Sequence, residues 1–169
     1  MTIRQTTLLQ INDLLSLFAE ARGTIAKLGI DQWQDGYPNR EVVEADILSG
    51  CSHAVTIDHK LVGTFVLLFD GEPTYEVITD GKWLTDGQGS YTAIHRVAVA
   101  VASRGKGVSS EILAFAEARA KEKGHASLRI DTHEGNVVMR RMLEKHGFVH
   151  CGTVYLQNGA KRVAYEKLI

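Results

Sequence analysis

A short basic turn that contains glycine carries the clearest chemical signal in the sequence. Residues 104–107 read Arg-Gly-Lys-Gly and stand between an alternating apolar run, 91–100, and residues 108–120, whose apolar side chains recur at helical spacing. The pattern predicts a strand, a turn and a helix. The first amides of such a helix have no partner within it, the helix dipole is positive there, and glycine lets the backbone approach a ligand. Phosphate is the typical ligand of this arrangement, although a solvated turn would also explain the glycines.

One side chain in the strand that leads into this turn is of a type that titrates near neutral pH. In an extended strand Ala93, His95, Val97 and Val99 share a face. Imidazole titrates near neutral pH, so His95 is the group in this strand best suited to move a proton. The structural alternative is a histidine hydrogen-bonded inside the sheet. Arg96 points to the other face and is expected to pair with a carboxylate.

The sequence after the turn predicts a strand that pairs in parallel with the first, then a second helix and two more strands. An apolar run at 126–132 completes a strand–helix–strand unit, which implies a right-handed crossover and parallel pairing. A second helix is expected at 136–146. Two further strands, 148–156 and 160–168, flank an Asn-Gly pair, which is a strong hairpin signal.

The first half of the chain predicts two helices and three strands. They are a strand at 2–7, a helix at 10–28, a helix at 40–49 capped by Asn39, and a hairpin of 53–58 and 61–69 that turns at His59-Lys60. Residues 74–90 show no clear element. The loop 31–39 holds two aromatic residues among turn formers, so it either covers a pocket or plugs the core.

Composition limits the class of protein. The chain has 169 residues, 44% hydrophobic residues and a net charge of −1, which fits one domain spanning 1–169 and argues against nucleic-acid or membrane-surface binding. There is no bilayer-spanning stretch and no signal-peptide pattern. Cys51 and Cys151 are far apart without a ligand cluster, so unpaired thiols in a reducing cytoplasm and no metal are expected.

Two motifs together resemble the signature of the GNAT superfamily of acyl-CoA-dependent N-acetyltransferases. The turn, read as Arg104-x-x-Gly107-x-Ser109, is similar to the family's R/Q-x-x-G-x-G/A loop, with serine as a small substitute at the last position. The run from Asn136 through the second helix to the Gly-Phe pair at 147–148 is similar to a later stretch of the family. The resemblance covers the C-terminal half well, and the N-terminal half only in the order of its elements.

The resemblance implies an α/β (α+β) fold with a central mixed, mostly antiparallel twisted sheet, a splayed parallel pair and about four flanking helices. It also implies transfer of an acetyl group from acetyl-CoA to a primary amine by direct attack in a ternary complex, without a metal. Binding of coenzyme A would use strand and turn backbone and one amide side chain, namely Val97, Ala98, Val99, Arg104, Gly105, Lys106, Gly107, Val108, Ser109 and Asn136. A plain helix N-cap is the alternative role for Asn136.

Amine acetylation needs a base for the ammonium group and an acid for the leaving thiolate. His95 fits the base, and some relatives look similar in placing a histidine here. Leu143 stands where many members carry a tyrosine acid, so the usual acid is absent. Tyr155 is the expected replacement, with Tyr91, Cys151 or water as alternatives.

The acceptor is expected to be a small-molecule or peptide amine. Small amines, amino-acid derivatives, aminoglycoside-like antibiotics and protein N-termini all fit. Trp33 and Tyr37 are the expected acceptor wall, and Asp131 and His133 are either substrate or relay groups or purely structural. Family members are often dimers, so a homodimer is compatible with the resemblance.

Two other interpretations fit parts of the pattern. A dinucleotide-binding βαβ unit would use the two glycines after a strand and Asp131 at the end of the next strand. It lacks the third glycine, where Ser110 stands, and only one crossover is evident. A non-catalytic acyl-CoA sensor on the same fold is suggested by the missing tyrosine at Leu143.

Overall fold

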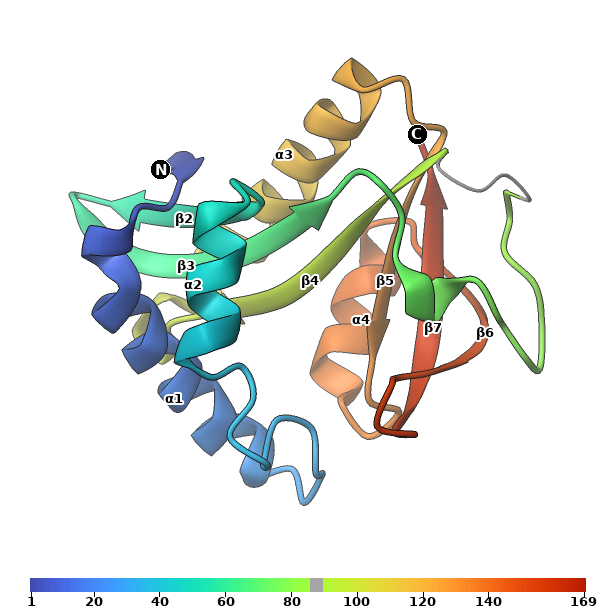
Figure 1. The fold of residues 1–169 in the computed structure, drawn as a ribbon, viewed down its shortest axis with the longest axis horizontal. Coiled ribbons are helices and arrows are strands. Elements are labelled where there is room, and N and C mark those ends of the chain that lie inside the picture. The colour runs from blue at the N-terminus through green and yellow to red at the C-terminus, as the bar shows by residue number, and fades with distance from the viewer. Residues whose placement is uncertain (86–89) are drawn as a thin grey trace. The chain divides into compact units, whose positions relative to one another are not determined.

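The computed structural model describes residues 1–85 and 90–169 and contains seven strands and four α-helices (Figure 1). In chain order they are β1 (Thr2–Gln5), α1 (Ile11–Ala26), α2 (Arg40–Leu48), β2 (Ser52–Ile57), β3 (Lys60–Leu68), β4 (Tyr91–Val99), α3 (Val108–Glu122), β5 (Ser127–Thr132), α4 (Val137–Lys145), β6 (Val149–Tyr155) and β7 (Lys161–Leu168). The predicted mixed, mostly antiparallel sheet is confirmed, with strand order β1-β2-β3-β4-β5-β7-β6. Across the described part of the chain, no helix has the length and apolar character to cross a membrane.

Contacts divide the chain into two compact units. Unit 1 consists of Met1–Leu67 and Arg96–Phe115, and unit 2 consists of Leu68–His95 and Ala116–Ile169. Two elements continue from one unit into the other. β4 changes unit after His95, and α3 changes unit after Phe115.

Unit 1 contains an antiparallel sheet with an apolar helical layer. β2 pairs with both β1 and β3, and Ala100 at the end of β4 donates its amide to Val62 O of β3 at 2.9 Å. Asn39 caps α2 as predicted, because its side chain accepts from the amide of Val42. α1 runs unbroken through its glycine, and its apolar side packs with α2 and β4 through Ile11, Leu14, Leu17, Phe18, Ala21, Val43, Ile47 and Ala98.

The β2–β3 hairpin turns one residue earlier than the sequence indicated. Lys60 pairs with Ile57, so the turn residues are Asp58 and His59, both left-handed with φ of 48° and 63°. Such a two-residue turn matches the twist of the strands it joins. The expected turn at His59-Lys60 is therefore wrong by one position.

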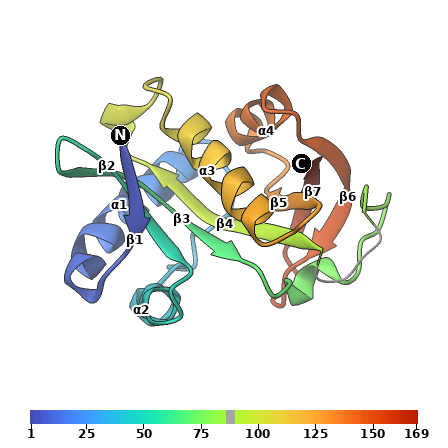
Figure 2. The same ribbon diagram turned by 90° about the horizontal axis from the view of Figure 1, so that it is seen from above.

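The helices α2 and α3 cover opposite faces of the β2–β3 hairpin (Figures 1 and 2). On the α3 face, the ring of Phe115 lies 5.8 Å from Phe65 and 5.4 Å from His53. Gly63 allows α3 to approach the sheet closely, because a Cβ there would come within 3.0 Å of Val108. The start of α3, and so the turn before it, is held against the sheet.

Unit 2 holds the parallel pair, which opens after a short stretch. Tyr91, Thr92 and Ala93 of β4 pair with Ser127, Leu128 and Arg129 of β5. The pairing ends there, although both strands continue. β5, β7 and β6 are antiparallel, and α4 packs on them, with Arg140 Nε donating to Tyr165 OH at 3.0 Å.

A left-handed residue interrupts β4. Arg96 has φ of 52°, which costs a non-glycine residue free energy and breaks the two-residue alternation of a strand. The shared face predicted for Ala93, His95, Val97 and Val99 therefore cannot be extended past Arg96. Beyond it the buried side chain is that of Ala98, at 3% exposure.

Candidate functional site

His95 lies between two carboxylates in unit 2. Its Nε2 is 3.0 Å from Glu72 Oε2, and its Nδ1 is 3.9 Å from Asp131 Oδ1. Nε2 is buried, and its contact with Glu72 departs from hydrogen-bond alignment, so this atom has no aligned partner within the described residues. The candidate base is thus a ring with an acidic group near each nitrogen, and apo catalytic contacts are often misaligned in this way.

Glu72 is held by a short turn that also carries Tyr75. It caps the 3₁₀ turn Pro73–Tyr75, where its carboxylate accepts from the amide of Thr74 at 3.1 Å and the hydroxyl at 2.8 Å. Its own amide donates to Tyr91 OH at 2.9 Å. Burial opposes ionisation, but the close contact and charge of His95 and the two Thr74 donors lower the pKa of Glu72 to about 2. Glu72 is therefore a fixed negative charge near neutral pH.

Tyr75 covers one face of the His95 ring. The two rings are 5.6 Å apart at an angle of 31°, and Tyr75 OH donates to Asp131 Oδ1 at 2.7 Å. Burial, together with the charges and hydrogen bond of the nearby carboxylates, raises the pKa of Tyr75 well above its ordinary value. The phenol therefore stays protonated and acts as a permanent donor to Asp131.

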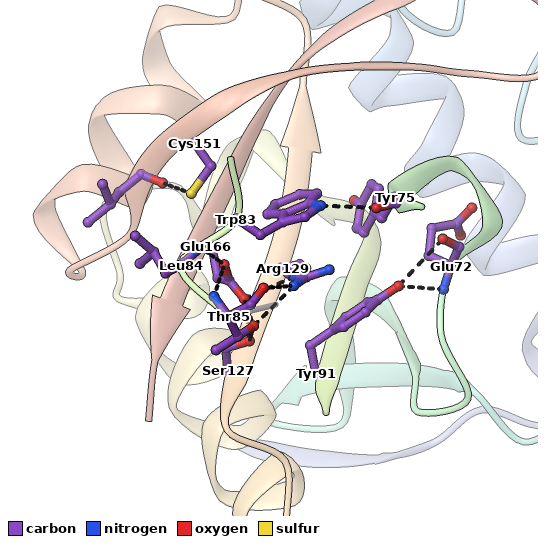
Figure 3. Close-up of polar contacts among 11 residues, drawn as sticks. Glu72, Tyr75, Trp83, Leu84, Thr85, Tyr91, Ser127, Arg129, Cys151 and Glu166 are labelled. Carbon is purple, nitrogen blue, oxygen red and sulfur yellow. Dashed lines mark hydrogen bonds and ion pairs between the residues drawn. The ribbon is translucent and has the colours of Figure 1, made fainter. Parts of the chain in front are cut away.

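A buried ion pair fixes the segment that supports Tyr75 (Figure 3). Trp83 Nε1 donates to Tyr75 O at 3.0 Å. The Arg129 guanidinium lies over Trp83 and Tyr91, 4.2 Å and 4.0 Å from the ring centroids. Arg129 Nε donates to Glu166 Oε1 at 2.9 Å, and the two side chains are 5% and 0% exposed.

Glu166 collects donors from two segments far apart in sequence. It accepts from Ser127 Oγ at 2.6 Å, from Leu84 N at 2.5 Å and from Thr85 Oγ1 at 2.5 Å. Burial raises the pKa of Glu166, but these donors and Arg129 outweigh it and lower that pKa. Residues 83–85 are thereby bound to β5 and β7, and Trp83 is held against Tyr75 (Figure 3).

The sequence did not identify this assembly. Residues 74–90 were expected to lack a clear element, yet they include the end of the Pro73–Tyr75 turn and an isolated bridge between Thr79 and Thr153. Residues 86–89 lie outside the described part of the chain. A usable signal was present at Glu72, because an acidic residue directly before proline is typical of a cap followed by a helical turn.

The predicted anion-binding turn lies in unit 1 and is open on its main-chain side. Gly105 and Gly107 have φ of 75° and 80°, and a Cβ built on either would meet no atom within 4 Å. Arg104 and Lys106 are exposed. The first amides of α3 have no intrahelical acceptor, and Ser109 is half-buried beside them. Backbone donors, positive charge and free approach together fit a diphosphate.

The N-cap of α4 and one residue within this helix take structural roles. Asn136 Oδ1 accepts from the amide of Met139 at 3.2 Å, so the N-cap alternative is confirmed for that oxygen. Leu143 is fully buried. A hydrocarbon side chain in that position cannot supply a proton.

The three side chains considered as the acid that protonates the thiolate differ in their hydrogen bonds and in their exposure. Tyr91 OH accepts from the amide of Glu72 and donates to Glu72 O at 3.5 Å. Cys151 Sγ donates to Val149 O at 3.4 Å, and burial raises the pKa of its thiol (Figure 3). Tyr155, the last residue of β6, is 50% exposed. Tyr155 is the most accessible of the three.

The predicted acceptor-wall residues lie in unit 1 and are anchored there. Trp33 contacts Phe18 edge-on with ring centroids 5.8 Å apart, as expected of an aromatic that plugs the core. Tyr37 OH accepts from Arg96 Nη1 at 2.5 Å. Arg96 also binds both oxygens of Asp46 at 2.6 Å, which confirms the expected carboxylate partner.

The groups predicted for the site are distributed over both units. Trp33, Tyr37 and the turn 104–107 belong to unit 1, whereas His95, Asn136 and Tyr155 belong to unit 2. In unit 2 the structure brings Asp131 to His95. His133 instead accepts from the amide of Gly135 at 3.0 Å, within its own turn. Within residues 1–85 and 90–169, no group of three or more metal-ligating side chains is assembled.

Comparisons with known proteins give a consistent family. A family model described as Acetyltransferase (GNAT) family matches residues 11–148. The solved structure of an acetyltransferase of the GNAT family from Streptococcus agalactiae 2603 is 38% identical, with a TM-score of 0.85 over 99% of this chain and 95% of that one. A search of curated protein sequences gives no match.

Two more distant structures share the fold. The PaiA N-acetyltransferase from Thermoplasma acidophilum, solved in complex with coenzyme A, is 17% identical with a TM-score of 0.73, covering 99% of this chain and 98% of that one. The ribosomal-protein-alanine N-acetyltransferase from Brucella melitensis is 18% identical with a TM-score of 0.64, covering 100% of both chains.

Proposed function

We infer the reaction from one premise: this chain belongs to the GNAT family of acetyltransferases. We propose that it transfers the acetyl group of acetyl-CoA to a primary amine by direct attack in a ternary complex. Both units are proposed to act as one catalytic domain, residues 1–169, because the family match spans both. Family membership also replaces the dinucleotide-binding interpretation.

The observation that best supports the proposed mechanism is the position of His95 between two carboxylates. A titratable ring between Glu72 and Asp131 lies just past the point where β4 and β5 stop pairing. We propose that the acceptor enters where the two strands stop pairing, and the ring offers a base for the ammonium group. Trp33 and Tyr37 remain the proposed acceptor wall.

Coenzyme A is proposed to bind through the turn and the end of β4. Main-chain amides of residues 104–109 would hold the diphosphate, and backbone groups of 97–99 would pair with the pantetheine arm as an added strand. The NH₂ group of Asn136 would contact the same arm. The complex of the Thermoplasma acidophilum protein with coenzyme A supports a ligand of this type.

Gly107→Ala is expected to raise the KM for acetyl-CoA about tenfold with little change in kcat, because alanine disfavours the left-handed φ of 80° that directs these amides. Gly124→Ala is the matched control. Gly124 has φ of 74° and equally open surroundings but ends α3 rather than preceding it. Steady-state thiol release at varied acetyl-CoA concentration measures KM and kcat of both variants, and equal rises in KM would contradict the assignment.

Tyr155 is proposed to protonate the leaving thiolate in place of the tyrosine that Leu143 replaces. Tyr155→Phe removes only the hydroxyl, so kcat should fall about tenfold while acetyl-CoA affinity is unchanged. Cys151→Ala, a change at the alternative group, should leave kcat within about twofold. Steady-state thiol release measures both variants, and the reverse pattern would transfer the role to Cys151.

The proposed function is tested with a panel of acceptors. Primary alkylamines, arylalkylamines, an aminoglycoside and short peptides are incubated with acetyl-CoA, and release of free thiol is followed. Thiol release that depends on one acceptor class supports the transferase. Binding of acetyl-CoA without release for any acceptor would instead support the acyl-CoA sensor, which the buried Leu143 favours.

A further inference from the structure

We propose that Asp131, fixed by Tyr75, binds the acceptor as an ammonium cation beside Nδ1 of His95. The inference rests on the proposed function, because it concerns the acceptor of the same reaction. It selects primary alkylamines, which carry a charge near neutral pH, over acceptors whose nitrogen is a weak base and uncharged.

The separation of the two atoms suits a shared nitrogen. Asp131 Oδ1 and His95 Nδ1 are 3.9 Å apart, beyond the range of a direct hydrogen bond. One nitrogen can contact both atoms at about 2.9 Å, the ordinary N–H···O or N–H···N distance. The other ring nitrogen, Nε2, is buried beside Glu72. Nδ1 is therefore the ring atom that we assign to the acceptor.

Asp131 is held in place for this contact. Its side chain is 9% exposed, and Tyr75 OH donates to its Oδ1 at 2.7 Å. Trp83 Nε1 donates to the backbone carbonyl of Tyr75 at 3.0 Å, and this bond holds the main chain that carries the phenol. The raised pKa of Tyr75 keeps its proton on the phenol. Tyr75 is a positioning residue and not a source of protons for the reaction.

The proton and electron balance follows from this placement. One N–H bond of the ammonium group points to Asp131 and another to Nδ1. The proton of the N–H bond that points to Nδ1 moves to that ring nitrogen. The lone pair freed on the acceptor nitrogen then forms the N–C bond with the acyl carbon. The C–S bond breaks, and its electron pair leaves with sulfur. The nitrogen loses a second proton as the amide forms. One of the two protons ends on the thiol and the other in water.

The test compares two acceptors of nearly the same shape. They are the panel alkylamine with the fastest thiol release and the O-alkylhydroxylamine in which oxygen replaces the carbon next to nitrogen. The second has a weakly basic nitrogen and is neutral near pH 7. Asp131→Asn should raise the KM of the alkylamine at least about tenfold, because a charge-assisted hydrogen bond is lost. The KM of the neutral hydroxylamine should stay within about twofold of its wild-type value.

Two further variants complete the test. Tyr75→Phe keeps the ring and Asp131 but frees the carboxylate, so the same contrast should appear at about threefold to fivefold. The Tyr75→Phe variant tests the same proposal if Asp131→Asn does not fold. Glu134→Gln, an exposed carboxylate three residues along, should change neither KM. The KM for acetyl-CoA should stay within about twofold in all three variants.

Each outcome decides the proposal. Loss confined to the charged acceptor supports it. Equal losses for both acceptors, or a raised KM for acetyl-CoA, would show that Asp131 is structural and overturn it. If the hydroxylamine is not acetylated, its inhibition constant is compared in place of KM. If the wild-type protein releases no thiol with any amine, the proposed function itself is contradicted, and this result is distinct from the others.

Discussion

Replacement of His95 with glutamine is expected to lower kcat by at least about tenfold, and on the order of a hundredfold, for an alkylamine acceptor. Glutamine retains polarity and size but cannot take a proton near neutral pH. The dissociation constant for acetyl-CoA should stay within about twofold, because the proposed coenzyme A contacts are made by other residues. Thiol release at saturating acetyl-CoA, with titration calorimetry for binding, measures the two effects separately.

The deficit should depend on pH in a defined direction. As pH rises toward the acceptor's own pKa, near about 10 for an alkylamine, more of the acceptor is already neutral and less needs a base. The ratio of wild-type to variant rates should therefore shrink. His59→Gln is the control, since His59 is exposed at the β2–β3 turn. A wild-type rate in His95→Gln would remove His95 from the mechanism.

Features decided by neighbouring residues could be predicted from the sequence. The turn at 104–107, the Asn39 cap and the Asn-Gly hairpin between β6 and β7 depend on a few adjacent residues. The parallel pair followed from the right-handed crossover rule, which is a general property of the chain. These signals placed most helices and strands within two residues of their observed bounds.

Features that depend on distant residues could not be predicted in the same way. An ion partner for Arg96 was expected, but nothing local indicated Asp46, fifty positions earlier. The left-handed backbone of Arg96 itself is unusual for a residue that is not glycine, so the alternation rule failed there. Glu72 and Tyr75 reach His95 only because a turn after β3 folds back toward β4 in unit 2. The acidic surroundings of the candidate base were therefore invisible in the sequence.

Breaking the buried Arg129–Glu166 pair is expected to have the largest effect on stability. Arg129→Met removes the cation and leaves Glu166, which is fully buried, without its charged partner. The free energy of unfolding should fall by about 3–5 kcal/mol, as is typical when one member of a buried ion pair is removed. Because Arg129 also lies between Trp83 and Tyr91, the loss includes packing. Urea denaturation near neutral pH measures the change.

A matched exposed pair separates burial from charge. Arg119 and Glu122 form an ion pair on α3 with 44% and 60% exposure, so Arg119→Met should cost at most about 1 kcal/mol because solvent screens the charges. The pH dependence gives a second check. The pKa of Glu166 is lowered in the folded state, so its stabilisation is present above the ordinary value of 4.5 and is lost as pH falls below it. The difference between wild type and Arg129→Met should therefore shrink in acid. Equal losses for Arg119→Met and Arg129→Met would contradict the large stabilisation expected of the buried Arg129–Glu166 pair.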